Sequence, residues 1–67
     1  MIMHPVSSSN IASIGWGDNI LYVEFSYNNR TYRYANVPRY VYEELMNAHS
    51  HGKYFAEYIK PKYTCLY

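Results

Sequence analysis

Alternating apolar and polar residues between positions 20 and 36 (ILYVEFSYNNRTYRYAN) predict two paired β-strands. Successive strand side chains point to opposite faces, so the first strand gathers apolar residues on one side, namely Leu21, Val23, Phe25 and Tyr27. A two-residue turn at positions 28–29 joins the strands, because both asparagines tolerate the positive φ that a type I′ turn requires. The segment therefore predicts a β-hairpin.

The two-residue turn also predicts which residues stand opposite each other. It pairs Tyr27 with Arg30, Phe25 with Tyr32, and Val23 with Tyr34. Both tyrosines of the second strand thereby join the apolar face. On the other face Glu24 stands opposite Arg33, an opposite-charge pair that contributes about 0.2–1 kcal/mol. Apolar pattern and charge pairing thus predict the same register.

The preceding residues, 10–16 (NIASIGW), predict a third strand on the other side of the hairpin. A turn centred on Asp18 and Asn19 would return the chain into the next strand. It pairs Trp16 with Leu21 and Ile14 with Val23, and it places three residues on the core face: Ala12, Ile14 and Trp16. We therefore expect a three-stranded antiparallel meander.

Helical spacing follows, and it predicts two helices, at about 38–48 and 50–60. Pro38 fits a first helical turn, and the first apolar stripe comprises Val41, Leu45 and Ala48, widened by Tyr42 and Met46. Ser50 is a suitable N-cap for the second helix, Pro61 ends it, and its stripe comprises Phe55, Tyr58 and Ile59. The expected fold is α+β, a three-stranded antiparallel meander sheet packed against two C-terminal helices.

The 67 residues predict one small domain over residues 9–67, preceded by a poorly ordered lead-in at 1–8 that contains Pro5 and serines. Ten tyrosines and one tryptophan supply bulk for a small core. The single Cys65 cannot form an internal disulfide, and no signal peptide or membrane-spanning apolar run is evident. A cytoplasmic location away from membranes is expected.

Catalytic and metal-binding patterns are not evident in the sequence. His49 and His51 form H-x-H, but structural zinc sites use four ligands in paired short spacings, and His4 and Cys65 lie elsewhere. No base is evident for Cys65 as a nucleophile, and the five carboxylates are spread along the chain. We expect a protein that is not an enzyme and that holds neither metal nor cofactor.

Basic side chains interleaved with aromatics suggest a site for nucleic acid, comprising Arg39, Lys53, Tyr54, Lys60, Lys62 and Tyr63. Lysine and arginine neutralise phosphates, and exposed tyrosines stack on unpaired bases. In the structural alternative Arg33 pairs with Glu24, the lysines solubilise a helix end and the tyrosines are core. The net charge of +1 favours this alternative, because nucleic-acid binders are usually strongly basic.

Several segments in this order resemble the KTSC domain over residues 9–63: SNIASIGW (9–16), LYVEF (21–25), Tyr32-Arg33-Tyr34, Val37-Pro38, AHSHGKYF (48–55), Ile59 and Tyr63. This family comprises small stand-alone proteins of bacteria and phages and the C-terminal domain of some lysyl-tRNA synthetases. The resemblance implies RNA binding, the role suggested for the family from that association.

Two functions are therefore expected from the sequence, both without catalysis. The first is RNA or other nucleic-acid binding. The alternative is a protein–protein interaction module, including a phage or mobile-element protein that binds a host factor. Basic residues gathered on one face beside an exposed tyrosine would favour RNA, whereas an uncharged aromatic patch would favour a protein partner.

Overall fold

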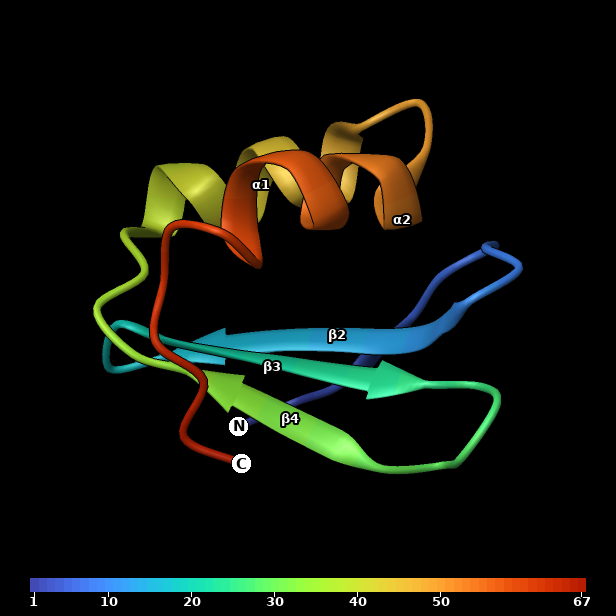
Figure 1. Cartoon of the computed structure of the whole chain (residues 1–67), viewed down its shortest axis with the longest axis horizontal. Helices are drawn as coiled ribbons and strands as arrows, with labels where there is room; N and C mark the ends of the chain where they lie inside the picture. Colours follow the sequence, from blue (N-terminus) through green and yellow to red (C-terminus); the bar gives the residue numbers. More distant parts are fainter.

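The computed structural model describes residues 1–67 as a four-stranded sheet covered on one face by helices (Figure 1). The strands pair antiparallel in sequential order: β1 (His4–Pro5), β2 (Ile11–Gly17), β3 (Ile20–Phe25) and β4 (Thr31–Tyr34). The helical layer comprises α1 (Arg39–Asn47), α2 (His51–Tyr54) and the π-helix η1 (Phe55–Ile59). The α+β class and the C-terminal helical layer are confirmed, and the sheet has one strand more than predicted.

The additional strand, β1, comes from the segment interpreted as a lead-in. His4 pairs with Ile14 and Pro5 with Ser13 along the outer side of β2. Proline is tolerated there because an edge strand need not donate every N–H to a ladder. Two residues are too few to show a period of two, so the apolar pattern could not predict this strand.

The β2–β3 hairpin has the predicted register, with Trp16 opposite Leu21 and Ile14 opposite Val23. Its turn is the expected one, because Asp18 and Asn19 both have positive φ, 52° and 63°. A two-residue type I′ turn thus joins β2 to β3.

A β-bulge changes the start of β2. Ile11 pairs with Phe25 and Ser13 with Glu24, so Ala12 is the extra residue of the bulge. Ile11 is fully buried as a result, whereas Ala12 is only half-buried. The prediction that Ala12 faces the core with Ile14 and Trp16 is therefore wrong.

The β3–β4 register differs from the prediction by two residues: Leu21 pairs with Tyr34, Tyr22 with Arg33, Val23 with Tyr32, and Glu24 with Thr31. The loop spans residues 26–29 and is closed by the Phe25 N–H, which donates to the Arg30 carbonyl at 3.0 Å. A shift of two keeps each side chain on its predicted face. Tyr34 is accordingly buried and Tyr32 half-buried against the core.

The predicted Glu24–Arg33 pair does not form, because the two-residue shift separates these side chains. Glu24 instead accepts a hydrogen bond from the Ser13 hydroxyl at 2.7 Å. The Arg33 guanidinium donates to the main-chain oxygen of Tyr67 at 3.1 Å. Each charged group thus bonds to a partner other than the predicted one.

The core lies between the sheet and the helices. Trp16 helps to join the layers, because its indole N–H donates to the Val37 carbonyl at 2.7 Å. Eleven buried residues form one cluster: Ile11, Ile14, Leu21, Val23, Phe25, Tyr34, Val37, Val41, Leu45, Phe55 and Ile59.

The two predicted helices are present, with shorter bounds and one unexpected form. Pro38 is the N-cap of α1, and Ser50 is the predicted N-cap of α2, whose hydroxyl accepts from the Lys53 N–H at 3.3 Å. The second helix continues as η1, in which the Lys60 N–H donates to the Phe55 carbonyl five residues earlier. This wider turn aligns Phe55 with Ile59, and the predicted stripe member Tyr58 is exposed.

After η1 the chain turns back and runs beside β4 (Figure 1). The Ala35 N–H donates to the Thr64 carbonyl at 2.9 Å, and the Leu66 N–H donates to the Arg33 carbonyl at 2.6 Å. Tyr63 is half-buried and Leu66 exposed. None of the helices combines the length and the apolar character that crossing a bilayer requires.

Candidate functional site

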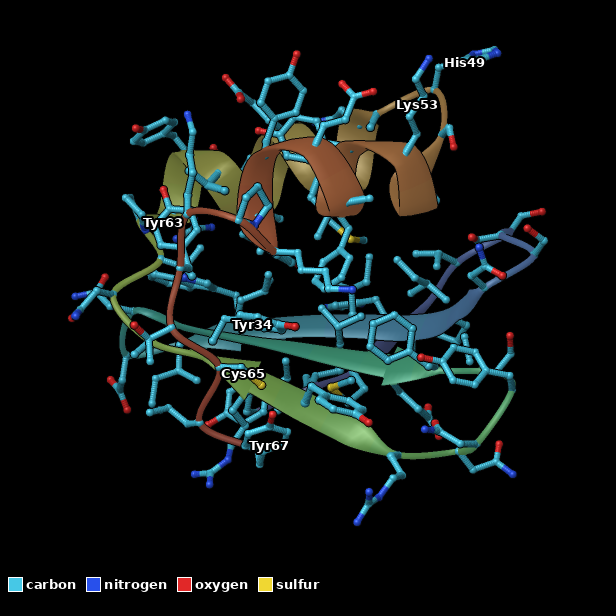
Figure 2. All side chains as sticks on the ribbon, viewed as in Figure 1. Tyr34, His49, Lys53, Tyr63, Cys65 and Tyr67 are labelled. Atoms are coloured by element: carbon cyan, nitrogen blue, oxygen red, sulfur yellow. The ribbon has the colours of Figure 1, made fainter.

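The six residues predicted to contact nucleic acid do not gather in one hollow of the surface. Arg39 lies at the start of α1 and forms an ion pair with Glu43 at 3.2 Å. Figure 2 shows Lys53 and Tyr63 at opposite ends of the α2–η1 helix. Lys60 and Lys62 are exposed after this helix, and Lys62 lines no hollow.

Tyr54 makes its contacts with Glu44 and Tyr58, within the helical layer. Its hydroxyl donates to the Glu44 carboxylate at 2.6 Å, and its ring lies 4.9 Å from that of Tyr58. Burial, followed by the hydrogen bond to Glu44, raises the pKa of Tyr54 to about 12. A carboxylate beside this ring disfavours a phosphate at the same place.

A cleft without apolar residues lies between two segments that are distant in sequence, 7–10 and 49–53. It has a volume of about 520 Å³, and Figure 2 shows His49 and Lys53 together at this end of the helical layer. We call it the polar cleft. Its lining contains no carboxylate: Ser7, Ser8, Ser9, Asn10, His49, Ser50, His51, Gly52 and Lys53.

Hydrogen bonds within the polar cleft leave donors available. The Ser8 hydroxyl oxygen accepts from the N–H groups of Asn10 and Ile11, each at 3.3 Å, and the hydroxyl hydrogen is left to donate. Nδ1 of His51 lies 2.8 Å from the Leu45 carbonyl oxygen. A carbonyl has no proton to give, so Nδ1 carries the proton and Nε2 is the nitrogen left to respond to a ligand.

An adjoining hollow of about 270 Å³ has a different character, and we call it the aromatic groove. Asn10 and Gly52 line both hollows, so the two lie next to each other. Tyr27 is 71% exposed, and its ring centre lies 5.5 Å from that of Phe25. The groove is lined by Asn10, Ile11, Phe25, Tyr27, Gly52, Phe55, Ala56 and Lys60.

A third hollow beside Lys53 contains a carboxylate. This shallow hollow shares His49, Ser50 and Lys53 with the polar cleft, and it also includes Glu57. Glu44 lies nearby through its bond to Tyr54, which lines the same hollow. The polar cleft thus has a basic and aromatic neighbour on one side and a carboxylate on the other.

Arg39 belongs to a separate, mostly apolar cleft of about 500 Å³. The rings of Trp16 and Tyr42 stack there with centres 6.3 Å apart. Its lining comprises Met1, Ile2, His4, Trp16, Arg39 and Tyr42. This surface has no residue in common with the polar cleft or the aromatic groove.

Of the six predicted residues, Lys53 and Tyr54 therefore share one hollow, and Lys53 and Lys60 line two adjoining hollows. Sequence reasoning missed Tyr27, which the two-residue turn had assigned to the core face, and the polar residues at 7–10 and 49–51. The available signal was the motif pair SNIASIGW and AHSHGKYF, whose facing ends form much of the polar cleft. No three His, Cys, Asp or Glu side chains come together as a metal site would require.

Comparison with known proteins assigns the chain to a family. The sequence profile of the KTSC domain matches residues 7–63. A protein of Tsukamurella paurometabola is 35% identical over 66 residues, which cover 96% of this chain and 97% of that protein. The crystal structure of a KTSC domain protein from Yersinia pestis matches with a TM-score of 0.89 and 41% identity, covering 96% of this chain and 92% of that one. This chain belongs to the KTSC domain family, as the motifs predicted.

Proposed function

We propose that this chain binds single-stranded nucleic acid, RNA above all, along the aromatic groove and the polar cleft. The observation that carries the proposal is a pair of adjoining hollows, one lined by the exposed ring of Tyr27 and by Lys60 and the other by Lys53. Single-strand binders use the same combination, an aromatic platform for bases and cations along the backbone. The proposed role is binding without catalysis, in the cytoplasm.

In this proposal the side chains of the two hollows contact different parts of the strand. A base stacks on Tyr27, whose ring is held in place by Phe25 and is exposed to solvent over most of its surface. Lys60 and Lys53 neutralise successive phosphates. The Asn10 side chain, which lines both hollows, offers its amide to a base edge or a sugar.

Fluorescence anisotropy with a labelled single-stranded RNA of about ten nucleotides tests the proposal. Two lysine–phosphate contacts give a slope of log affinity against log salt of about −1.4, and Lys53→Ala or Lys60→Ala each flattens it by about 0.7. Tyr27→Ala weakens binding by about 1–3 kcal/mol through lost stacking. Lys62→Ala is the matched control, because Lys62 lines no hollow and leaves the slope unchanged.

Two results would contradict this function. One is the absence of binding at tens of micromolar protein in low salt, since even non-specific electrostatic binders register in roughly that range. The other is a salt slope that Lys53→Ala and Lys62→Ala flatten equally, because that would show diffuse attraction to the whole surface.

A second candidate, a protein–protein interaction module, is supported by the apolar cleft around Trp16 and Tyr42. Met1 and Ile2 on its rim are 63% and 73% exposed, and apolar surface of this kind marks protein contacts. Arg39 adds the side-chain type that interfaces favour. Ile2→Asp should abolish capture of a partner while leaving RNA affinity unchanged, and equal capture by both forms would exclude this cleft.

A further inference from the structure

The polar cleft offers more hydrogen-bond donors than a phosphate within a nucleic-acid chain can use. We propose that it binds a terminal phosphomonoester, the phosphorylated end of the strand that lies in the aromatic groove. This inference rests on the proposed function and identifies which strands are preferred. An internal phosphodiester has two non-bridging oxygens that share one negative charge, whereas a monoester has three such oxygens and carries about −1.5 to −2 charges at neutral pH.

Both segments that border the cleft carry donor groups. Residues 7–10 contribute three hydroxyls and the Asn10 amide, and residues 49–53 contribute the Ser50 hydroxyl, two imidazoles and the Lys53 ammonium. The hydroxyls of Ser8 and Ser50 already accept backbone N–H bonds, which orients their remaining hydrogens away from those amides. No carboxylate lines the cleft, so nothing in its lining repels a dianion.

The position of the cleft argues for a strand end. From the polar cleft a strand can continue along Asn10 and Gly52 into the aromatic groove, toward Tyr27 and Lys60. In the other direction, past Lys53, it would meet the carboxylate of Glu57. Lys60 in the aromatic groove favours a phosphodiester backbone, whereas Glu57 in the third hollow repels one. The bound strand should therefore end at the polar cleft, where the donor groups lie.

The hydrogen bond of His51 to α1 leaves its second ring nitrogen free for a ligand. Its Nδ1–H donates to the Leu45 carbonyl of α1, so Nε2 accepts in the neutral ring and donates in the imidazolium. His49 and Lys53 also line this cleft, and Glu57 lies only in the neighbouring hollow.

Three labelled oligonucleotides of one sequence test the proposal: a 5′-phosphate form, a 3′-phosphate form and a form with hydroxyls at both ends. One phosphorylated form should bind about tenfold more tightly than the hydroxyl form, the gain expected of new charge-assisted hydrogen bonds. Which end is preferred gives the strand direction. Lys53→Met and His49→Gln should shrink the preference, whereas Tyr27→Ala should weaken all three forms by the same factor.

The outcomes separate this inference from the proposed function. Equal affinity of the three forms, with Tyr27→Ala still weakening them, overturns the phosphomonoester site and leaves strand binding intact. A preference that Lys53→Met does not reduce also overturns it, because the end is then recognised elsewhere. If no oligonucleotide binds but a nucleoside monophosphate does, and Lys53→Met removes that binding, the phosphate site stands and the strand-binding function fails.

Discussion

Gly15 shows how one residue without a side chain shapes the outer face of the sheet. A Cβ at this position would collide with the sulfurs of Met1 and Met3 and would lie 2.9 Å from the Ile2 carbonyl oxygen. The two methionine side chains can move, but the backbone oxygen cannot move without shifting the N-terminal segment. Gly15 therefore permits residues 1–3 to lie close against β2.

Gly15→Ala should lower the free energy of unfolding by about 1–3 kcal/mol, as overpacking of a close contact does. Urea denaturation of the variant and the wild type measures the difference. Gly17→Ala is the matched control in the same strand, because its Cβ would meet only Met1 Cγ at an ordinary 3.6 Å. Equal stability of the two variants would show that residues 1–3 do not lie against Gly15 in solution.

The surroundings of Tyr34 raise the pKa of its phenol, and this shift makes stability depend on pH. Burial raises its pKa to about 12, and the adjoining Cys65 adds to the shift. In the unfolded chain the phenol has its ordinary pKa of about 10. The folded state therefore holds this proton more tightly, and the resulting stabilisation is complete below pH ~10 and is lost as pH rises through about 12.

The free energy of unfolding should accordingly fall between about pH 10 and pH 12. Tyr34→Phe should make this fall less steep, with the remaining part coming from groups such as Tyr54. Chemical denaturation at several alkaline pH values measures the steepness. Tyr40→Phe, at an exposed position, is the control. An unchanged steepness in Tyr34→Phe would contradict the assigned burial of the phenol.

At the scale of the elements, the two β-turns show where sequence reasoning holds. Asp18 and Asn19 form the predicted type I′ turn, because both adopt positive φ. At the second turn only Asn29 has positive φ, 56°, and the Asn28 carbonyl oxygen of the side chain accepts from the Arg30 N–H at 3.0 Å. This local side-chain bond competes with the type I′ geometry, and residue type alone did not distinguish the two.

Replacing each asparagine of the second turn by glycine tests this difference. Asn28→Gly should lower the free energy of unfolding by about 0.5–1.5 kcal/mol, because it removes the hydrogen bond to Arg30. Asn29→Gly should be neutral or slightly stabilising, because glycine adopts positive φ without strain. Thermal unfolding measures both. A type I′ turn in solution would make both substitutions neutral or stabilising.

The helical layer was predictable in outline but not in detail. The stripe of Val41 and Leu45 and the N-cap Ser50 followed from spacing and side-chain chemistry. The π-helix η1 did not, because a turn widened by one residue leaves no mark in the local pattern. Tyr58, which spacing had placed in the apolar stripe, lies within this π-helix and is exposed.

At the scale of the whole molecule, stability depends on one small core between two layers. Leu45 is fully buried beneath α1. Leu45→Ala should lower the free energy of unfolding by about 2–5 kcal/mol through lost transfer energy and a residual cavity. Guanidinium denaturation measures it, with Tyr40→Ala on the exposed side of the same helix expected to change stability by less than about 0.5 kcal/mol. An equally small change in the free energy of unfolding for both variants would show that Leu45 is not a core residue.

The candidate site depends on tertiary arrangement far more than the core does. The sequence pattern was enough to select Lys53 and Lys60 as candidates. Tyr27 lies near them only because the β3–β4 loop packs beside the second helix in the folded chain. Residues 7–10 reach the cleft only through the path that β1 imposes on the N-terminal segment. No period or spacing in the sequence encodes such a meeting of distant segments.

Residues 64–66 cover the C-terminal end of the outer edge of β4, where they bond the Arg33 carbonyl and the Ala35 N–H. An open edge is a template on which a second chain can add its own strand, and such pairing is a route to aggregation. The opposite edge is protected differently, since β1 has two residues and contains Pro5. The family profile ends at residue 63, so the segment that covers this end of the β4 edge lies just outside the matched domain.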